Sequence, residues 1–237
     1  MIGESRLSFW AAGSFCNKVV TMKKLVIFDL DGTLLNTIAD LANSTNYALA
    51  ENGFATHQVS EYNYFVGNGI NKLFERALPE KERNEENILK IRKAFLSHYE
   101  RHNMDHSSPY PGIADLLAAL QEKGVMIAVA SNKYQAATEK LVPYFFPDIH
   151  FVAILGQRDG VNTKPDPAIV HDILRIAQVS KEDALYVGDS NVDMQTAINS
   201  GVDACGVVWG FRPVEELESY HPKYIAHTAA DILEYLG

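Results

Sequence analysis

Residues 23–37 read KKLVIFDLDGTLLNT and constrain the fold more than any other stretch of the chain. Residues 25–28 are uniformly apolar, without the alternation of a strand that has one wet face, so they predict a strand buried on both sides in a parallel sheet. Asp29 and Asp31 follow at the carboxyl end of that strand, where ligands bind in open α/β sheets. Gly32 allows the backbone to turn sharply there. This segment therefore predicts a class of fold and the position of a site.

The two carboxylates also predict a type of chemistry. Carboxylates this close repel each other unless a cation neutralises them or one of them holds a proton. Mg²⁺ takes one or two protein carboxylates and completes its octahedron with waters and phosphate oxygens. Asp29 and Asp31 therefore indicate a magnesium site that supports phosphoryl transfer, although an Asp-x-Asp pair taken alone can also be a polar loop after a core strand.

Composition excludes several classes of protein. A chain of 237 residues that is 47% hydrophobic can bury one large core and a smaller second one. Its net charge of −9 argues against nucleic acid and anionic membranes as partners. No run approaches the roughly 18 apolar residues of a membrane span. We therefore expect a small-molecule ligand, and an anionic one would need a local cation.

The cysteines and the N-terminus bear on the cellular compartment. Cys16 and Cys205 cannot form a disulfide framework, so a reducing, cytoplasmic location is expected. Residues 1–21 faintly resemble a secretory signal, but Ser8 and Gly13 interrupt the apolar stretch. We interpret residues 1–21 as an N-terminal extension and Met22 as the start of the domain.

A helical insertion follows the first strand. Apolar residues recur at helical spacing in three segments, around residues 38–49, 70–78 and 88–99, and Asn52-Gly53 and Pro79 supply stop signals. No strand pattern interrupts them. Residues 37–107 are therefore predicted to form an all-helical cap, and residues 22–36 and 108–237 the α/β core.

Beyond residue 107 the pattern alternates between strand and helix. Buried strands are predicted at residues 125–130, 151–155, 184–187 and 205–208, with helices between them, which is typical of a doubly wound parallel-sheet (Rossmann-like) α/β domain. Ser131 and Asn132 follow one strand and Asp189 another. Lys164 precedes a Pro-Asp-Pro turn and is expected to reach the same edge of the sheet. Phosphoryl transfer needs a nucleophile, a proton donor, a metal and phosphate-binding groups, and all are available here.

Four motifs in order carry a family resemblance. They are DLDGTL at residues 29–34, ASN at 130–132, TKPDP at 163–167 and GDSNVD at 188–193. Together they resemble the signatures of the haloacid dehalogenase (HAD) superfamily, most of whose members are Mg²⁺-dependent phosphatases. The resemblance covers residues 23 to about 227 and implies that the helical insertion closes over the substrate.

The resemblance implies roles at matching positions. Asp29 resembles the nucleophile that becomes an aspartyl phosphate, and Asp31 resembles the acid that protonates the leaving alcohol and later draws a proton from water. Asp189 would bind Mg²⁺ with the Asp29 carboxylate and the Asp31 backbone carbonyl. Asp193 would orient the metal's waters or the neighbouring lysine, although direct ligation is also open.

Further positions resemble the phosphate-binding groups of the superfamily. Ser131 and Lys164 match its phosphate holders, and Lys164 would also offset the charge on Asp29. Thr33 and Asn132 lie within the same motifs and are predicted to contribute to phosphate binding.

The choice of reaction rests on Asp31. Dehalogenases of the superfamily lack an acid there because halide leaves without a proton, whereas an alkoxide needs one. Phosphonoacetaldehyde hydrolases add a Schiff-base lysine in the cap, and Lys72 is the helix lysine nearest the Gly67-Asn68-Gly69 loop, but nothing in the sequence indicates its desolvation.

The cap segment YFVGNGINKLFERALPE, the PYPG turn and the run VASNK look most like phosphoglycolate phosphatases. The expected reaction is hydrolysis of a small phosphate monoester, with 2-phosphoglycolate the favoured substrate. A β-phosphoglucomutase-like phosphotransferase is the alternative, and a catalytically idle binding protein on this fold is a more distant one. The oligomeric state, monomer or dimer, stays open.

Two cap features allow further interpretations. Gly67, Asn68 and Gly69 precede a predicted helix, whose free N–H groups could bind an anion other than the transferred phosphate, such as a substrate carboxylate. Lys72 and Arg76 could add charge there or be solvated surface cations. His98, His102 and His106 recur every four residues, which could bind a metal on a continuing helix or mark a solvated helix end.

Overall fold

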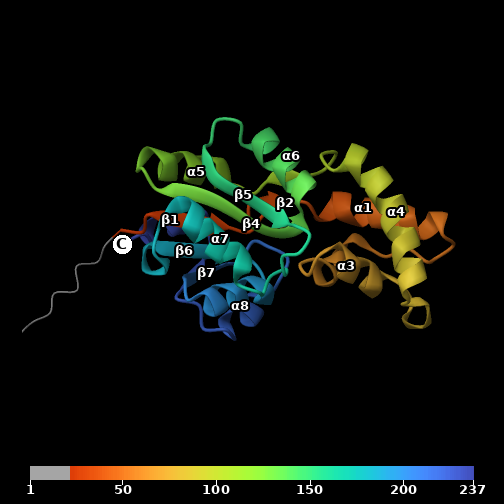
Figure 1. Ribbon diagram of the computed structural model, residues 1–237. Helices are drawn as coiled ribbons and strands as arrows, with labels where there is room; N and C mark the ends of the chain where they lie inside the picture. The colour runs from red at the N-terminus through yellow and green to blue at the C-terminus, as the bar shows by residue number, and fades with distance from the viewer. Residues whose placement is uncertain (1–21) are drawn as a thin grey trace, which may run out of the picture.

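A six-stranded sheet, all of whose neighbouring strands run parallel, forms the centre of the core (Figure 1). The computed structural model describes residues 22–237, so the N-terminal extension and Cys16 lie outside the described residues. The strand order is β5-β4-β1-β6-β7-β8. The strands are β1 (Leu25–Phe28), β4 (Met126–Tyr134), β5 (Phe151–Gln157), β6 (Ala184–Gly188), β7 (Asp203–Val207) and β8 (Tyr224–Ala226).

Both faces of the sheet are covered by helices. On one face lie α5 (Ile113–Glu122), α6 (Gln135–Phe145) and α10 (Asp231–Glu234); on the other lie α7 (Ala168–Ala177), α8 (Asn191–Ser200) and α9 (Val214–Glu218). Val26 and Phe28 belong to the first apolar cluster, and Leu25 and Ile27 to the second. Because alternate residues of β1 face two different cores, its sequence is apolar without interruption, as predicted.

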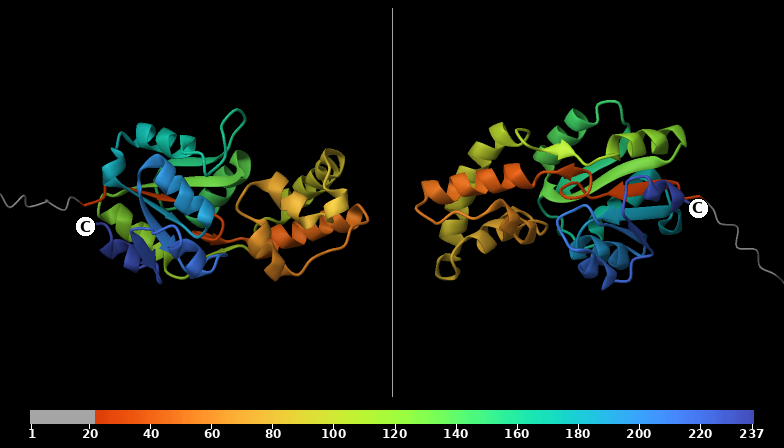
Figure 2. Two further views of the ribbon diagram at one scale, coloured as in Figure 1. Left: turned by 90° about the horizontal axis from the view of Figure 1, so that it is seen from below. Right: turned by 180° about the vertical axis from the view of Figure 1, so that it is seen from behind.

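The cap segment, residues 37–107, packs around an apolar cluster of its own. It contains α1 (Ile38–Glu51), α2 (Tyr62–Phe65), α3 (Ile70–Ala77) and α4 (Glu85–His102), with short 3₁₀ turns Val59–Glu61 and Glu80–Glu82. No strand interrupts these helices within the described cap segment. Leu49, Phe74, Ile91 and Phe95 are among its fully buried residues. Figure 2 shows the cap beside the sheet rather than on either face of it.

Two connections join the cap to the core, and they pair with each other. β2 (Leu35–Asn36) runs antiparallel to β3 (Ser108–Pro109). Beside this pair the buried carboxylate of Asp40, in the first turn of α1, accepts hydrogen bonds from the His106 amide at 3.0 Å and from the Ser107 amide and hydroxyl at 2.9 and 2.7 Å. The entry and exit of the cap are therefore held together at one point.

The direction of winding fixes where a ligand can bind. From β1 the chain proceeds to β4 and β5 on one side, and then to β6, β7 and β8 on the other. The crevice at such a switch point lies beyond the carboxyl ends of the central strands. β1 and its neighbours β4 and β6 therefore direct their C-terminal residues toward one place, and the cap lies at that end of the sheet (Figure 1).

Several boundaries differ from those predicted. The strand expected at residues 125–130 continues to Tyr134, because it resumes pairing with β5 after a register shift. The strand expected at 205–208 is Asp203–Val207. β8 and the short helices α2, α9 and α10 were not predicted, since their apolar runs are too short to show a period. No helix in residues 22–237 is long and apolar enough to cross a membrane.

Candidate active site

Three buried carboxylates meet at the carboxyl end of the central strands. Asp29 follows β1, Asp189 follows β6, and Asp193 lies in the first turn of α8. One carboxylate oxygen of each lies within 4.8 Å of the others. In the described residues this is the only group of three or more acidic, histidine or cysteine side chains close enough to hold one ion.

Lys164 supplies the positive charge within this group. Its Nζ atom lies 2.8 Å from Asp29 Oδ1 and 2.8 Å from Asp193 Oδ1, and it donates to the Tyr186 hydroxyl at 3.0 Å. Burial would lower the pKa of this ammonium, but the carboxylates of Asp193 and Asp29 outweigh burial and hold the pKa well above its usual value. The lysine therefore stays charged. Its peptide bond to Pro165 is cis.

One lysine does not neutralise three carboxylates. Burial, followed by repulsion from Asp193, raises the pKa of Asp29 from 3.8 to about 7. The same two causes raise the pKa of Asp189 well above its ordinary value. The Oδ1 atom of Asp29, although close to Lys164, accepts no hydrogen bond of normal geometry within residues 22–237. These oxygens fit a hard divalent cation such as Mg²⁺, with Asp29 and Asp189 as the side chains that would hold it.

The surroundings of Asp189 fix its carboxylate closely. Oδ2 accepts a hydrogen bond from the Phe211 amide at 2.7 Å, and Oδ1 accepts one from the Thr33 hydroxyl at 3.3 Å. A Cβ atom at Gly32 or Gly210 would overlap the Asp189 side chain. Thr33, predicted to bind phosphate, is fully buried and directed at Asp189. It therefore orients the carboxylate in this structure.

The bonds of Asp193 match an orienting role. Oδ1 accepts from Lys164 and from the Tyr186 hydroxyl at 3.1 Å, while Oδ2 accepts from the Ser190 amide at 3.1 Å and its hydroxyl at 2.6 Å. Ser190 and Asp193 also form the capping box of α8. Because each of its oxygens already accepts two hydrogen bonds, against one on each oxygen of Asp189, Asp193 is better suited to holding Lys164 than to direct ligation.

Asp31 has a partner that sequence reasoning missed. Its carboxylate accepts from the Thr37 hydroxyl at 2.7 Å and from Lys133 Nζ at 3.1 and 3.2 Å. Lys133 is buried, which would lower its pKa, but Asp31 and Tyr99 together outweigh burial and raise the pKa above its usual value. Ser131 and Lys133 are two residues apart in β4 and both line the cavity, so a lysine next to a predicted phosphate-binding motif was a signal available in the sequence.

Ser131 and Asn132 both reach the site, with different functions. Ser131 is buried, lines the cavity described below and accepts a hydrogen bond from the Lys133 amide at 3.2 Å. Asn132 donates through Nδ2 to the carbonyl oxygens of Gly67 at 2.9 Å and Lys164 at 3.1 Å, and it accepts from the Lys164 amide at 2.8 Å. Asn132 therefore connects the Lys164 loop with the cap.

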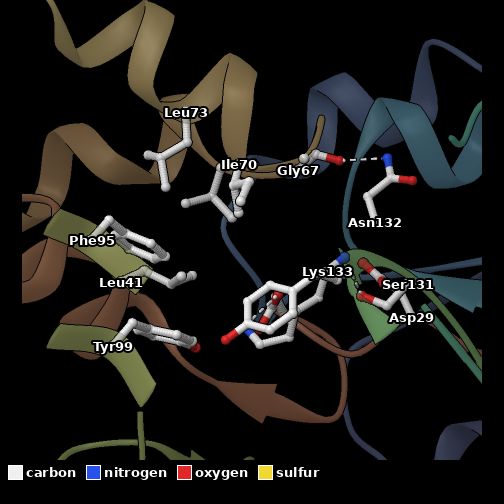
Figure 3. Close-up of a pocket in the computed structure, with 14 residues that line it drawn as sticks. Asp29, Leu41, Gly67, Ile70, Leu73, Phe95, Tyr99, Ser131, Asn132 and Lys133 are labelled. Atoms are coloured by element: carbon white, nitrogen blue, oxygen red, sulfur yellow. Dashed lines mark hydrogen bonds and ion pairs between the residues drawn. The ribbon is translucent and has the colours of Figure 1, made fainter. Parts of the chain in front are cut away.

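A cavity of about 480 Å³, counting the part open to solvent, lies between core and cap (Figure 3). Its core side carries the polar residues Asp29, Asp31, Ser131, Asn132 and Lys133, and Tyr134 borders it as well. Its cap side is mainly apolar and is formed by Leu41, Val66, Gly67, Gly69, Ile70, Leu73, Phe95 and Tyr99. The polar half can hold a transferred group, and the cap half faces whatever is attached to it.

The Gly67-Asn68-Gly69 loop borders this cavity, but its neighbouring cations are engaged elsewhere. Arg76 donates to the Phe65 carbonyl at 2.9 Å and to Asn68 Oδ1 at 2.8 Å. Lys72 is exposed and pairs with Glu75 at 2.6 Å. The alternative that Arg76 adds charge to an anion site is therefore not supported, because this guanidinium holds the loop itself.

The three spaced histidines do not form a metal site in this structure. α4 ends at His102, so His106 lies beyond it. The His98 and His102 rings stack with centroids 4.2 Å apart, and His102 Nδ1 lies 2.8 Å from Asp105. His98 Nδ1 contacts the Ser44 hydroxyl at 3.0 Å. The interpretation as a helix end is the one that fits.

The fold and site define a doubly wound α/β protein with a helical cap, whose buried carboxylates and lysines gather at the cavity between core and cap. The model of the haloacid dehalogenase-like hydrolases matches residues 26–207. The chain therefore belongs to the haloacid dehalogenase-like hydrolase family, as the motifs predicted.

Relatives within the family are phosphatases. A phosphoglycolate phosphatase of Mesorhizobium japonicum is 34% identical over 203 residues, covering 83% of this chain and 88% of that one. A phosphoglycolate phosphatase of Aquifex aeolicus is 29% identical over 213 residues, covering 90% and 96%. The crystal structure of a predicted phosphoglycolate phosphatase from Haemophilus somnus superposes with a TM-score of 0.85 at 29% identity, covering 92% and 99%. These similarities support a phosphoric monoester hydrolase.

Proposed function

We propose that the protein is a Mg²⁺-dependent phosphatase that hydrolyses 2-phosphoglycolate, or a closely similar small phosphate monoester, through an aspartyl phosphate on Asp29. The observation that carries the proposal is the meeting of Asp29, Asp31, Ser131, Lys164 and Asp189 at the carboxyl end of three adjacent strands. Each residue type has a defined task in phosphoryl transfer.

In the first half-reaction an Asp29 oxygen attacks phosphorus and the bond to the ester oxygen breaks. Asp31 gives its proton to the departing alkoxide, so the leaving group departs as an alcohol. Lys164 and Ser131 lie where they can bind the equatorial phosphoryl oxygens. A bound Mg²⁺, held by Asp29 and Asp189, would neutralise the negative charge that otherwise repels the phosphate.

In the second half-reaction water attacks the phosphorus of the aspartyl phosphate. Asp31 takes a proton from that water, inorganic phosphate leaves, and the Asp29 carboxylate is restored. The Thr37 hydroxyl and Lys133 hold the Asp31 carboxylate in place for both proton transfers. The cap covers the cavity and limits the entry of other waters, which strengthens the electrostatic interactions inside.

Two lines of support favour 2-phosphoglycolate. The relatives that are 34% identical over most of the chain are named phosphoglycolate phosphatases. The cavity places the cap loop at Gly67 and Gly69 opposite Asp29 and Asp31, so a substrate can contact both at once. We propose that this loop binds the substrate's leaving group. The cytoplasmic location and the oligomeric state, monomer or dimer, stay predictions.

A panel of phosphate esters tests the function. We expect 2-phosphoglycolate to be hydrolysed with the highest kcat/KM among 2-phosphoglycolate, β-glucose 1-phosphate, glucose 6-phosphate, glycerol 3-phosphate and an aryl phosphate, with Mg²⁺ required. Full activity in excess EDTA would contradict the metal requirement. Conversion of β-glucose 1-phosphate to glucose 6-phosphate without release of phosphate would show a phosphotransferase instead.

A further inference from the structure

Tyr99 is a buried residue whose hydroxyl has no hydrogen-bond partner. It lies in α4 and is fully buried. In residues 22–237 only three buried side-chain nitrogen or oxygen atoms lack a partner, and two of them, Tyr99 Oη and Asp29 Oδ1, belong to residues that border the same cavity. Buried polar atoms are normally paired, so an exception calls for a ligand or a special role. Asp29 Oδ1 has such a role in the proposed function.

Lys133 approaches Tyr99 from the opposite side of the cavity. Figure 3 shows the Tyr99 hydroxyl directed into the cavity from the cap, with Lys133 entering from the core. Lys133 Nζ lies 4.9 Å from the centroid of the Tyr99 ring, so the ammonium and the hydroxyl face the same part of the cavity. Its hydrogen bonds to the two Asp31 oxygens use two of three N–H donors. The third N–H donor is not engaged by Asp31, and the ammonium lies beside the Tyr99 ring.

The rest of the cap side offers no competing polar side chain. Leu41, Val66, Leu73 and Phe95 are buried and apolar, and Ile70 completes this wall. Besides Tyr134 at the end of β4 and the backbone of the Gly67–Gly69 loop, a polar group on the leaving part of a substrate would therefore find Tyr99 and Lys133 as partners. Since both side chains can donate, and one is a cation, they favour an anionic acceptor over a neutral one.

We propose that the Tyr99 hydroxyl and the Lys133 ammonium together recognise a carboxylate on the substrate's leaving group. The proposal rests on the proposed function, because the leaving group must emerge beside Asp31 to receive its proton. Lys133 bonds Asp31 directly, so the recognised carboxylate lies only a few bonds from the ester oxygen. The substrate class is then the phosphate esters of short hydroxy acids, and Tyr99 is a specificity-determining residue.

Tyr99→Phe tests this with two substrates that differ in one group, 2-phosphoglycolate and 2-hydroxyethyl phosphate. We expect the ratio of their kcat/KM values to fall about tenfold or more, because a hydrogen bond to a charged group is lost only with the carboxylate. Tyr62→Phe is the matched control: it removes another buried cap hydroxyl, which bonds Asn46 at 2.7 Å and does not border the cavity. Its ratio should equal that of the wild type.

Thermal unfolding separates recognition from a structural role. Because the Tyr99 hydroxyl has no protein partner, Tyr99→Phe should leave Tm equal or raise it, whereas Tyr62→Phe should lower it. An unchanged substrate ratio in Tyr99→Phe, or an equal loss on both substrates, would overturn the role of Tyr99 and leave the proposed function standing. A wild-type enzyme that hydrolyses 2-hydroxyethyl phosphate but not 2-phosphoglycolate would overturn the proposed substrate as well, so the two failures are distinguishable.

Discussion

Asn132 Nδ2 lies 2.9 Å from the carbonyl oxygen of Gly67, so a side chain at the end of a core strand holds the loop that borders the cap side of the cavity. The same side chain exchanges hydrogen bonds with the backbone of Lys164, at 3.1 and 2.8 Å. Lys164 and the cap loop are therefore positioned by one amide. Closure of the cap and placement of Lys164 should consequently be lost together.

Asn132→Ala should lower kcat/KM about 10- to 100-fold for every phosphate ester. The change leaves the buried Lys164 amide without its acceptor and frees the Gly67 loop, and each loss is of the order of 1–2 kcal/mol. Steady-state kinetics on 2-phosphoglycolate and an aryl phosphate would measure it. Asn199→Ala is the control, because Asn199 donates to Pro165 in the same loop at 2.8 Å but from the exposed side. A similar loss in both variants would mean that general loop mobility is responsible.

The Asn132 contacts also show where sequence reasoning reaches its limit. The four motifs located Asp29, Ser131, Lys164 and Asp189, because polar residues after buried strands must meet at one edge of a parallel sheet. Lys133 was missed although it directly follows the Ser131-Asn132 pair in the sequence. The sequence pattern could not indicate Tyr99, because the exposure of its hydroxyl to the cavity depends on how α4 packs against the core.

In the cap, too, local sequence patterns were predictable and tertiary contacts were not. The helical periods predicted α1, α3 and α4, since apolar spacing records which face is buried. The position of Arg76 on α3 was predictable, but its use in holding Asn68 was not, because that contact requires the loop to fold back on the helix. The role of Arg76 thus follows from a hydrogen bond between segments, which composition and spacing cannot show.

Asp29→Asn should abolish nearly all turnover while the fold is retained. An amide cannot form the acyl phosphate, so we expect a loss of at least several hundredfold in kcat. Pre-steady-state trapping of a phosphorylated protein should succeed with the wild type and fail with the variant. Retention of more than about a tenth of kcat, an effect of only about 1.4 kcal/mol, would falsify the assignment of the nucleophile.

The metal-free protein should lose stability as pH rises from about 4 to about 7. Burial and repulsion from Asp193 raise the pKa of Asp29 from 3.8 to about 7, so over this interval the folded state binds more protons than the unfolded state. The free energy of unfolding therefore falls as pH rises. Asp189, whose pKa is raised by the same causes, contributes in the same direction. Denaturant unfolding at several pH values in EDTA would measure the slope.

The same variant supplies the control for this pH dependence. Asp29→Asn removes the titrating group, so its metal-free form should show a smaller slope and a higher Tm at pH 7 than the wild type. Added Mg²⁺ should raise the Tm of the wild type more at pH 7.5 than at pH 5, because it binds the ionised carboxylates. A slope of opposite sign would contradict the uncompensated charge that we infer among Asp29, Asp189 and Asp193.

Asp189→Ala should raise the Mg²⁺ concentration needed for half-maximal activity by at least tenfold. The site offers few protein ligands, so losing one hard oxygen weakens it strongly. A Mg²⁺ titration of activity would show the shift, and Ca²⁺ should inhibit because its larger, more flexible shell alters the attack geometry. Asp172→Ala, which removes a carboxylate paired with Arg158 and Arg175 away from the cavity, should leave the Mg²⁺ requirement unchanged.

Gly67→Val should raise the KM for 2-phosphoglycolate more than that for an aryl phosphate. Gly67 has a φ of 113° and borders the cavity, and a Cβ there would meet no atom within 4 Å, so the side chain disturbs the loop through backbone strain rather than collision. In the proposed function the transferred phosphate, common to both substrates, is bound by the core, and the leaving group faces the loop. Gly53→Val is the matched control, because Gly53 has a φ of 76°, an equally open Cβ position and no contact with the cavity. Equal losses on both substrates in Gly67→Val, with none in Gly53→Val, would mean that the loop acts in cap closure and not in recognising the leaving group.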